Sequence, residues 1–61
     1  MTKGNPKKLG AVLRSYRLLR EMDLRTLGAE IGVSAPTVLR IEQGRAIDAD
    51  TLLKILNWLL R

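Results

Sequence analysis

The sequence predicts an all-α fold of four helices in a single small domain. In four segments, apolar residues recur at spacings of three and four, the periodicity of a helix that buries one face. No segment alternates apolar and polar residues with the period of two that a half-buried strand shows. A residue of the kind that caps a helix precedes each pattern. The length of 61 residues is less than half of the roughly 150 that one domain typically takes, so the chain is one small domain or a fragment that needs a partner.

The first helix is expected to begin at Pro6, with Asn5 as its N-cap, and to end near Met22. Residues 1–5 are expected to form a flexible arm. The residues predicted to form the buried face of this first helix are Leu9, Val12, Leu13, Tyr16 and Leu19.

Two short helices joined by a tight turn are expected next. Asp23 is the expected N-cap of the second helix, which ends at Gly32, and Val33 in the turn points into the core. Ser34 caps the third helix, which ends at Gly44. The inner residues are predicted to be Leu24, Leu27, Gly28 and Ile31 in the second helix and Val38 and Ile41 in the third.

The last helix follows a loop over residues 45–47 and is expected to run to the end of the chain. Asp48 and Asp50 suit its N-terminus, so we interpret them as capping residues and not as a metal or acid-base pair. Its predicted inner stripe is Leu52, Ile55, Leu56 and Leu59, whereas Leu53, Trp58 and Leu60 fall outside it. The latter three are either covered by the first two helices or, as we expect, form a homodimer interface.

The composition excludes several classes of function. Hydrophobic residues at 46% and charged residues at 28% are typical of a folded globular chain. The chain has no Cys and no His, so we expect no disulfide, no zinc or other metal site, no cofactor and no enzymatic role. No apolar run approaches the roughly 20 residues of a membrane span, and a cytoplasmic location is expected.

The charge favours an anionic partner. Eleven basic against six acidic residues give a net charge of +5. Seven of the eleven basic residues lie in the first 25 positions: Lys3, Lys7, Lys8, Arg14, Arg17, Arg20 and Arg25. This excess fits nucleic acid or a membrane surface, and charge alone does not separate the two. The first three lysines are either a DNA-contacting arm or a solubilising tail.

Together these features resemble the Cro and repressor type of helix-turn-helix proteins of phages and bacteria, the XRE family. The resemblance covers residues 9–60. It rests on Leu13, Arg14, Arg17, residues 27–34, residues 41–45, Thr51 and Leu52. The chain differs from the family at Leu24, where Gln is usual, and at Gly28, where Ala is usual.

The resemblance implies a compact four-helix, lambda-repressor-like domain, with a short terminal turn as an optional fifth helix. It places the third helix in the DNA major groove. On a helical wheel its outward residues are Pro36, Leu39, Arg40 and Gln43. The implied base-contacting residues are Ala35, Pro36, Leu39 and Arg40. Contacts with the DNA backbone are expected from Ser34, Thr37, Gln43, Arg45, Arg25, Arg20, Lys7 and Lys8. The resemblance also implies a structural ion pair between Arg17 and Glu42.

Sequence analysis therefore predicts a sequence-specific regulator of transcription, a Cro-like repressor that acts as a homodimer on a two-fold symmetric operator in double-stranded DNA. Operator occlusion is the expected mechanism because 61 residues leave no room for a small-molecule domain. Two alternatives stay open. One is a protein-interaction module, such as an antitoxin or assembly subunit on the same scaffold, which an exposed Leu39 and a surplus Trp58 would suit. The other is a basic amphipathic peptide that orders on a membrane surface.

Overall fold

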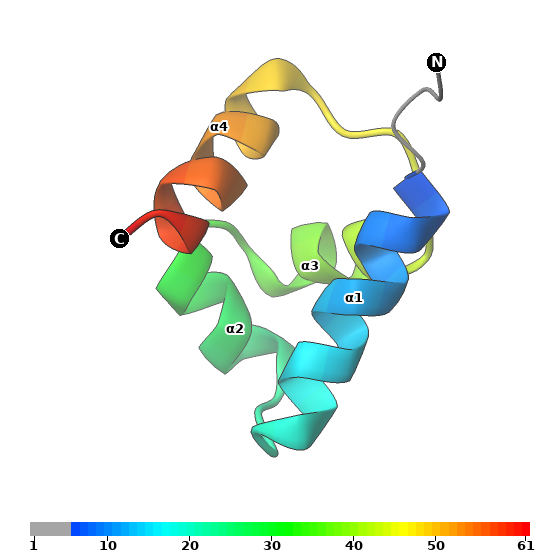
Figure 1. The fold of residues 1–61 in the computed structure, drawn as a ribbon, viewed down its shortest axis with the longest axis vertical. Helices are drawn as coiled ribbons and strands as arrows, with labels where there is room; N and C mark the ends of the chain where they lie inside the picture. Colours follow the sequence, from blue (N-terminus) through cyan, green and yellow to red (C-terminus); the bar gives the residue numbers. More distant parts are fainter. Residues whose placement is uncertain (1–5) are drawn as a thin grey trace.

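The computed structural model describes residues 6–61 and contains, within this range, four helices and no strand (Figure 1). The helices are α1 (Pro6–Leu19), α2 (Leu24–Ile31), α3 (Ala35–Glu42) and α4 (Ala49–Leu59). The predicted all-α fold is confirmed. The expected arm over residues 1–5, with Lys3 and the Asn5 cap, lies outside the described residues.

The starts of α2, α3 and α4 are fixed by the predicted caps. In each case a side-chain oxygen accepts a hydrogen bond from a backbone N–H three residues later: Asp23 from Thr26 at 2.7 Å, Ser34 from Thr37 at 3.4 Å and Asp48 from Thr51 at 2.8 Å. Gly32 ends α2 in the left-handed conformation, with φ of 98°, as expected. These capping residues are strong local signals in the sequence, because each accepts a hydrogen bond from a backbone N–H that the start of a helix leaves free.

The first helix ends at Leu19, so the expected end near Met22 is wrong. Glu21 takes a left-handed conformation, with φ of 54°, and the N–H of Met22 donates to the carbonyl of Arg17 at 3.0 Å. This closing turn reverses the chain before the extended Asp23, which must leave α1 in order to cap α2.

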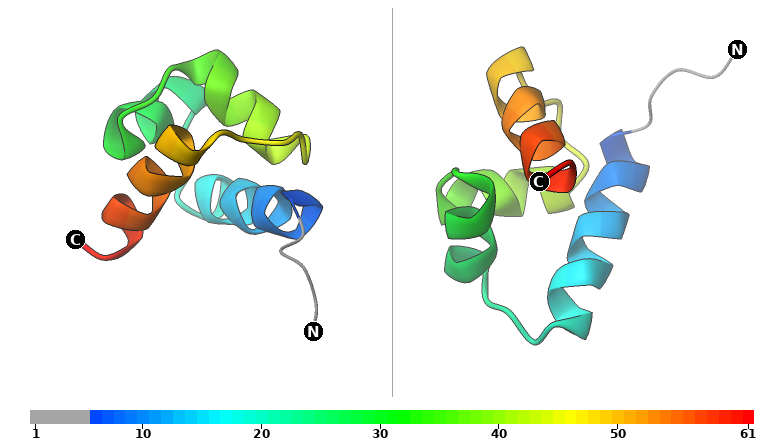
Figure 2. Two further views of the ribbon diagram at one scale, coloured as in Figure 1. Left: turned by 90° about the horizontal axis from the view of Figure 1, so that it is seen from above. Right: turned by 60° about the vertical axis from the view of Figure 1, so that its left-hand side comes forward.

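The third helix lies between the others and packs against both α1 and α2, while α4 packs on α2 (Figure 2). The buried core draws on all four helices and consists of Leu13, Leu27, Ile31, Val38, Ile41, Ile55 and Trp58. Because Val38 and Ile41 are held in this core, the opposite side of α3 is left facing solvent.

The buried face of α1 differs from the predicted one, because Val12 and Leu19 are 64% and 84% exposed. The helix instead turns Gly10 towards α3. A Cβ atom at Gly10 would lie only 2.2 Å from the carbonyl oxygen of Ile41, so no side chain fits there. At 100° per residue, Val12 and Leu19 lie about 160° and about 180° around the helix from Gly10. The close approach at Gly10 therefore turns both residues to solvent.

The inner face of α4 also differs from the predicted stripe. Ile55 and Trp58 are buried, and the assignment of Trp58 to a dimer interface is wrong, since it is 5% exposed within one chain. Its ring meets the ring of Tyr16 edge-on with centroids 5.2 Å apart, and its Nε1–H donates to the Glu30 carboxylate at 3.2 Å. Trp58 carries the largest apolar surface on α4, and here its polar N–H also finds an acceptor.

Turning Trp58 inwards leaves a continuous apolar arc on the outer side of α4. We call it the leucine face; its members, each 43–81% exposed, are Leu52, Leu53, Leu56, Leu59 and Leu60. Leu53 and Leu60 were expected outside the core and are exposed, whereas Leu52, Leu56 and Leu59 were expected inside it. At 100° per residue the five side chains fall within an arc of about 120°.

Candidate nucleic-acid interface

The outer side of α3 presents the side chains that the sequence predicts for it. Pro36, Leu39, Arg40 and Gln43 are exposed, while Ala35 and Thr37 are partly exposed at its flanks. Ser34 is exposed at the start of the helix, with its Oγ 2.9 Å from the hydroxyl of Thr37. Arg40 is the one charged residue on this side of α3.

The turn between α2 and α3 holds the two helices close together. The N–H of Val33 donates to the carbonyl of Gly28 at 2.9 Å. A Cβ atom at Gly28 would lie 2.6 Å from the carbonyl oxygen of Val33 and 3.4 Å from the side chain of Val38. The tightest contact of Gly28 is thus with the turn itself, which fixes the angle at which α3 leaves α2.

The end of α3 is anchored to α1 by the ion pair that the sequence predicts. The guanidinium of Arg17 donates through Nε and Nη2 to the two carboxylate oxygens of Glu42, at 2.7 and 3.0 Å. A third N–H donates to the carbonyl of Met22 at 3.1 Å. The side chains are 15% and 4% exposed, and the hydrogen bond to Glu42 raises the pKa of Arg17. The pair is structural and takes no part in the outer face of α3.

The other basic residues expected to contact the DNA backbone lie in two groups near opposite ends of α1. Lys7 lies against the end of α3, because a Cβ atom at Gly44 would be 2.8 Å from the Cγ of Lys7. This brings Lys7 close in space to Arg45, which follows Gly44 in the chain. Arg20, stacked 5.4 Å from the centroid of Tyr16, lies about 20 Å along α1 from Lys7, near the start of α2 and Arg25.

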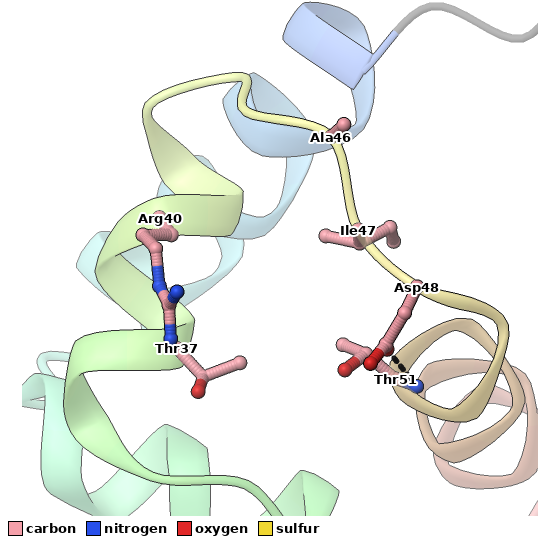
Figure 3. Close-up of a pocket in the computed structure, with 6 residues that line it drawn as sticks. All are labelled: Thr37, Arg40, Ala46, Ile47, Asp48 and Thr51. Carbon is pink, nitrogen blue, oxygen red and sulfur yellow. Dashed lines mark hydrogen bonds between the residues drawn. The ribbon is translucent and has the colours of Figure 1, made fainter.

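A cleft of about 330 Å³ lies between α3 and the segment that leads into α4 (Figure 3). Its lining residues are Thr37, Arg40, Ala46, Ile47, Asp48 and Thr51. Arg40 and Thr37 stand on one side, and Asp48 and Thr51 on the other. The sequence alone does not connect these residues, because Asp48 follows a loop whose path no periodic pattern predicts. The predicted role of Asp48 as a helix cap does not indicate that it lies across the cleft from Arg40.

In the part of the chain that the structure describes, no group of three or more His, Cys, Asp and Glu side chains is arranged to hold a metal ion. No helix among residues 6–61 combines the length and apolar character needed to span a membrane.

In a comparison with known families, a family model described as helix-turn-helix matches residues 13–57. This range begins within α1, contains α2, α3 and the turn between them, and ends within α4. The comparison with curated proteins gives no match.

Proposed function

Because the chain belongs to the helix-turn-helix family of XRE type, and is a DNA-binding regulator at that level, we propose that it recognises specific sites in double-stranded DNA by placing α3 in the major groove. The observation that carries the proposal is the two-sided character of α3. Val38 and Ile41 hold its inner side, while Arg40 on the outer side is exposed. A guanidinium in this position can bond to O6 and N7 of guanine.

Binding strength in this proposal comes mostly from the phosphate backbone. The rest of the outer side is Ala35, Pro36 and Leu39, which can contact only the methyl group of thymine. Backbone contacts are assigned to Ser34, Thr37, Gln43, Arg45, Arg25, Arg20, Lys7 and Lys8. Neutralising phosphates releases counterions, so affinity should fall steeply as salt rises.

Two arginine variants test these roles. Arg40→Ala should reduce discrimination at one base pair by about 1–3 kcal/mol and leave binding to random DNA nearly unchanged, because it removes a base contact. Arg45→Ala should weaken binding to all duplexes alike and lower the salt slope by about one, because it removes a phosphate contact. Titrations of selected and random duplexes at several salt concentrations measure both quantities. Equal effects of the two variants would contradict the assignment.

We further propose that the protein acts as a homodimer joined through the leucine face of α4. A contiguous patch of five exposed leucines is costly in water, and a two-fold dimer lets the same patch cover itself. Two α3 helices about 34 Å apart would then read a two-fold symmetric operator. Such a dimer would block access to the DNA that it covers, so repression by operator occlusion is the simplest mechanism.

The dimer makes a separate prediction. Leu56→Glu, which places a charge at the middle of the leucine face, should give a folded monomer in sedimentation and weaken operator binding, since the two half-sites are then bound separately. Val12→Glu is the matched control, because Val12 is 64% exposed on α1 and outside that face. A wild-type protein that sediments as a monomer at every concentration would exclude the dimer.

A protein-interaction module on the same scaffold is the second candidate function. Leu39 favours it, since this apolar side chain is 43% exposed on the outer side of α3. The salt titration separates the two functions, because an interaction module should show no preference among duplexes at any salt concentration.

A further inference from the structure

The cleft beside α3 carries opposite hydrogen-bonding chemistry on its two sides. Arg40 has only donors to offer, whereas the ionised carboxylate of Asp48 has only acceptors. The two residues line opposite sides of an open space of about 330 Å³ (Figure 3). A group that satisfies both sides must therefore present acceptors at one edge and an N–H donor at the other.

Asp48 is held in place and kept ionised by the start of α4. Its Oδ1 accepts from the N–H of Thr51 at 2.8 Å. Hydrogen bonds from the hydroxyl and the backbone N–H of Thr51 lower the pKa of Asp48 below its usual value. At neutral pH the carboxylate is thus a fixed, negatively charged acceptor on the side of the cleft.

A phosphate group does not suit this cleft, although Arg40 would attract one. The carboxylate of Asp48 would repel a phosphate held between the two sides, and Asp50 adds a second negative charge in the first turn of α4. Asp50 forms an ion pair with Lys54 at 3.3 Å, one turn further along α4. The local charge therefore favours a polar, uncharged group.

Two adjacent G·C pairs supply the required pattern in the major groove, one through its guanine and the next through its cytosine. Guanine presents the acceptors O6 and N7, and cytosine presents the donor N4–H₂. We propose that Asp48 is a second specificity-determining residue, which accepts a hydrogen bond from the amino group of a cytosine beside the guanine that Arg40 contacts. This inference rests on the proposed function, in which α3 binds in the major groove, and adds a base-reading residue outside α3.

Selection of bound duplexes from random DNA tests the inference, with the wild type, Asp48→Asn and Asp23→Asn compared side by side. Asn caps a helix as well as Asp does, so Asp48→Asn should fold normally while its amide no longer offers a purely accepting group. We expect the wild type to select cytosine at one position next to the Arg40-dependent guanine. Asp48→Asn should lose that preference by roughly 5- to 150-fold, the equivalent of one good base contact.

Asp23→Asn is the matched control, because it makes the same change at the cap of α2, away from the cleft. It should select the same sequences as the wild type. Asp48→Asn overturns the inference if its selected sequences match those of the wild type, or if it binds all duplexes more tightly by one factor. The latter result would mean that Asp48 only repels phosphate. Both outcomes leave the proposed function standing, whereas a wild type without any sequence preference would remove the proposed function itself.

Discussion

Trp58→Ala should remove a large share of the protein's stability and lower its unfolding temperature sharply. Replacing a buried Trp by Ala typically costs about 3–5 kcal/mol, through lost burial and the cavity left behind. A chain of 61 residues has a total stability of only about 3–9 kcal/mol. The side chain also holds Tyr16 and Glu30 in place, through the edge-on ring contact and the Nε1–H hydrogen bond. Thermal unfolding followed by circular dichroism measures the loss.

Trp58→Phe is the matched control for this variant. It keeps a ring against Tyr16 and loses the hydrogen bond to Glu30, a change of about 1 kcal/mol. The protein should stay folded, with a lower unfolding temperature. If Trp58→Ala kept its stability and lost only its ability to dimerise, the residue would belong to an interface between chains and not to the core.

The helix boundaries of this protein are largely readable from its sequence, because they depend on local chemistry. Asp23, Ser34 and Asp48 each bond to a backbone N–H three residues away, so neighbouring residues contain the whole signal. The end of α1 is the exception, since Glu21 takes a left-handed conformation that is unusual for a residue with a side chain.

The rotation of α1 and α4 about their own axes was harder to predict. Apolar spacing alone placed Val12 and Leu19 inside, because it gives no weight to Gly10, whose lack of a side chain lets α1 approach α3. Likewise, four leucines and isoleucines outweighed the single Trp58 in the pattern of α4, although Trp58 makes the specific contacts with Tyr16 and Glu30. The contacts that set these rotations form between helices, so the apolar spacing within one helix does not predict them.

The candidate site divides in the same way. The outer side of α3, with Arg40, follows from the periodicity of one helix and agrees with the structure. The cleft depends on how the loop over residues 45–47 brings Asp48 to the side opposite Arg40, which is a three-dimensional property. The sequence therefore does not predict that Asp48 belongs to the site, and only the structure places it there.

Arg17→Met should destabilise the fold by about 3–5 kcal/mol, because it leaves the carboxylate of Glu42 buried without its partner. The Glu42 side chain is only 4% exposed, so water cannot replace the two hydrogen bonds that Arg17 donates. Chemical denaturation, read as the change in the free energy of unfolding, measures this cost.

The double variant Arg17→Met, Glu42→Leu separates the value of the ion pair from the cost of an unpaired charge. Replacing both partners of a buried pair by apolar residues is often neutral or stabilising, so the double variant should recover most of the stability lost by Arg17→Met. Its selected DNA sites should match those of the wild type, because the pair lies away from the outer side of α3. A loss below about 1 kcal/mol for Arg17→Met alone would contradict this account, since that is the range of an exposed surface pair.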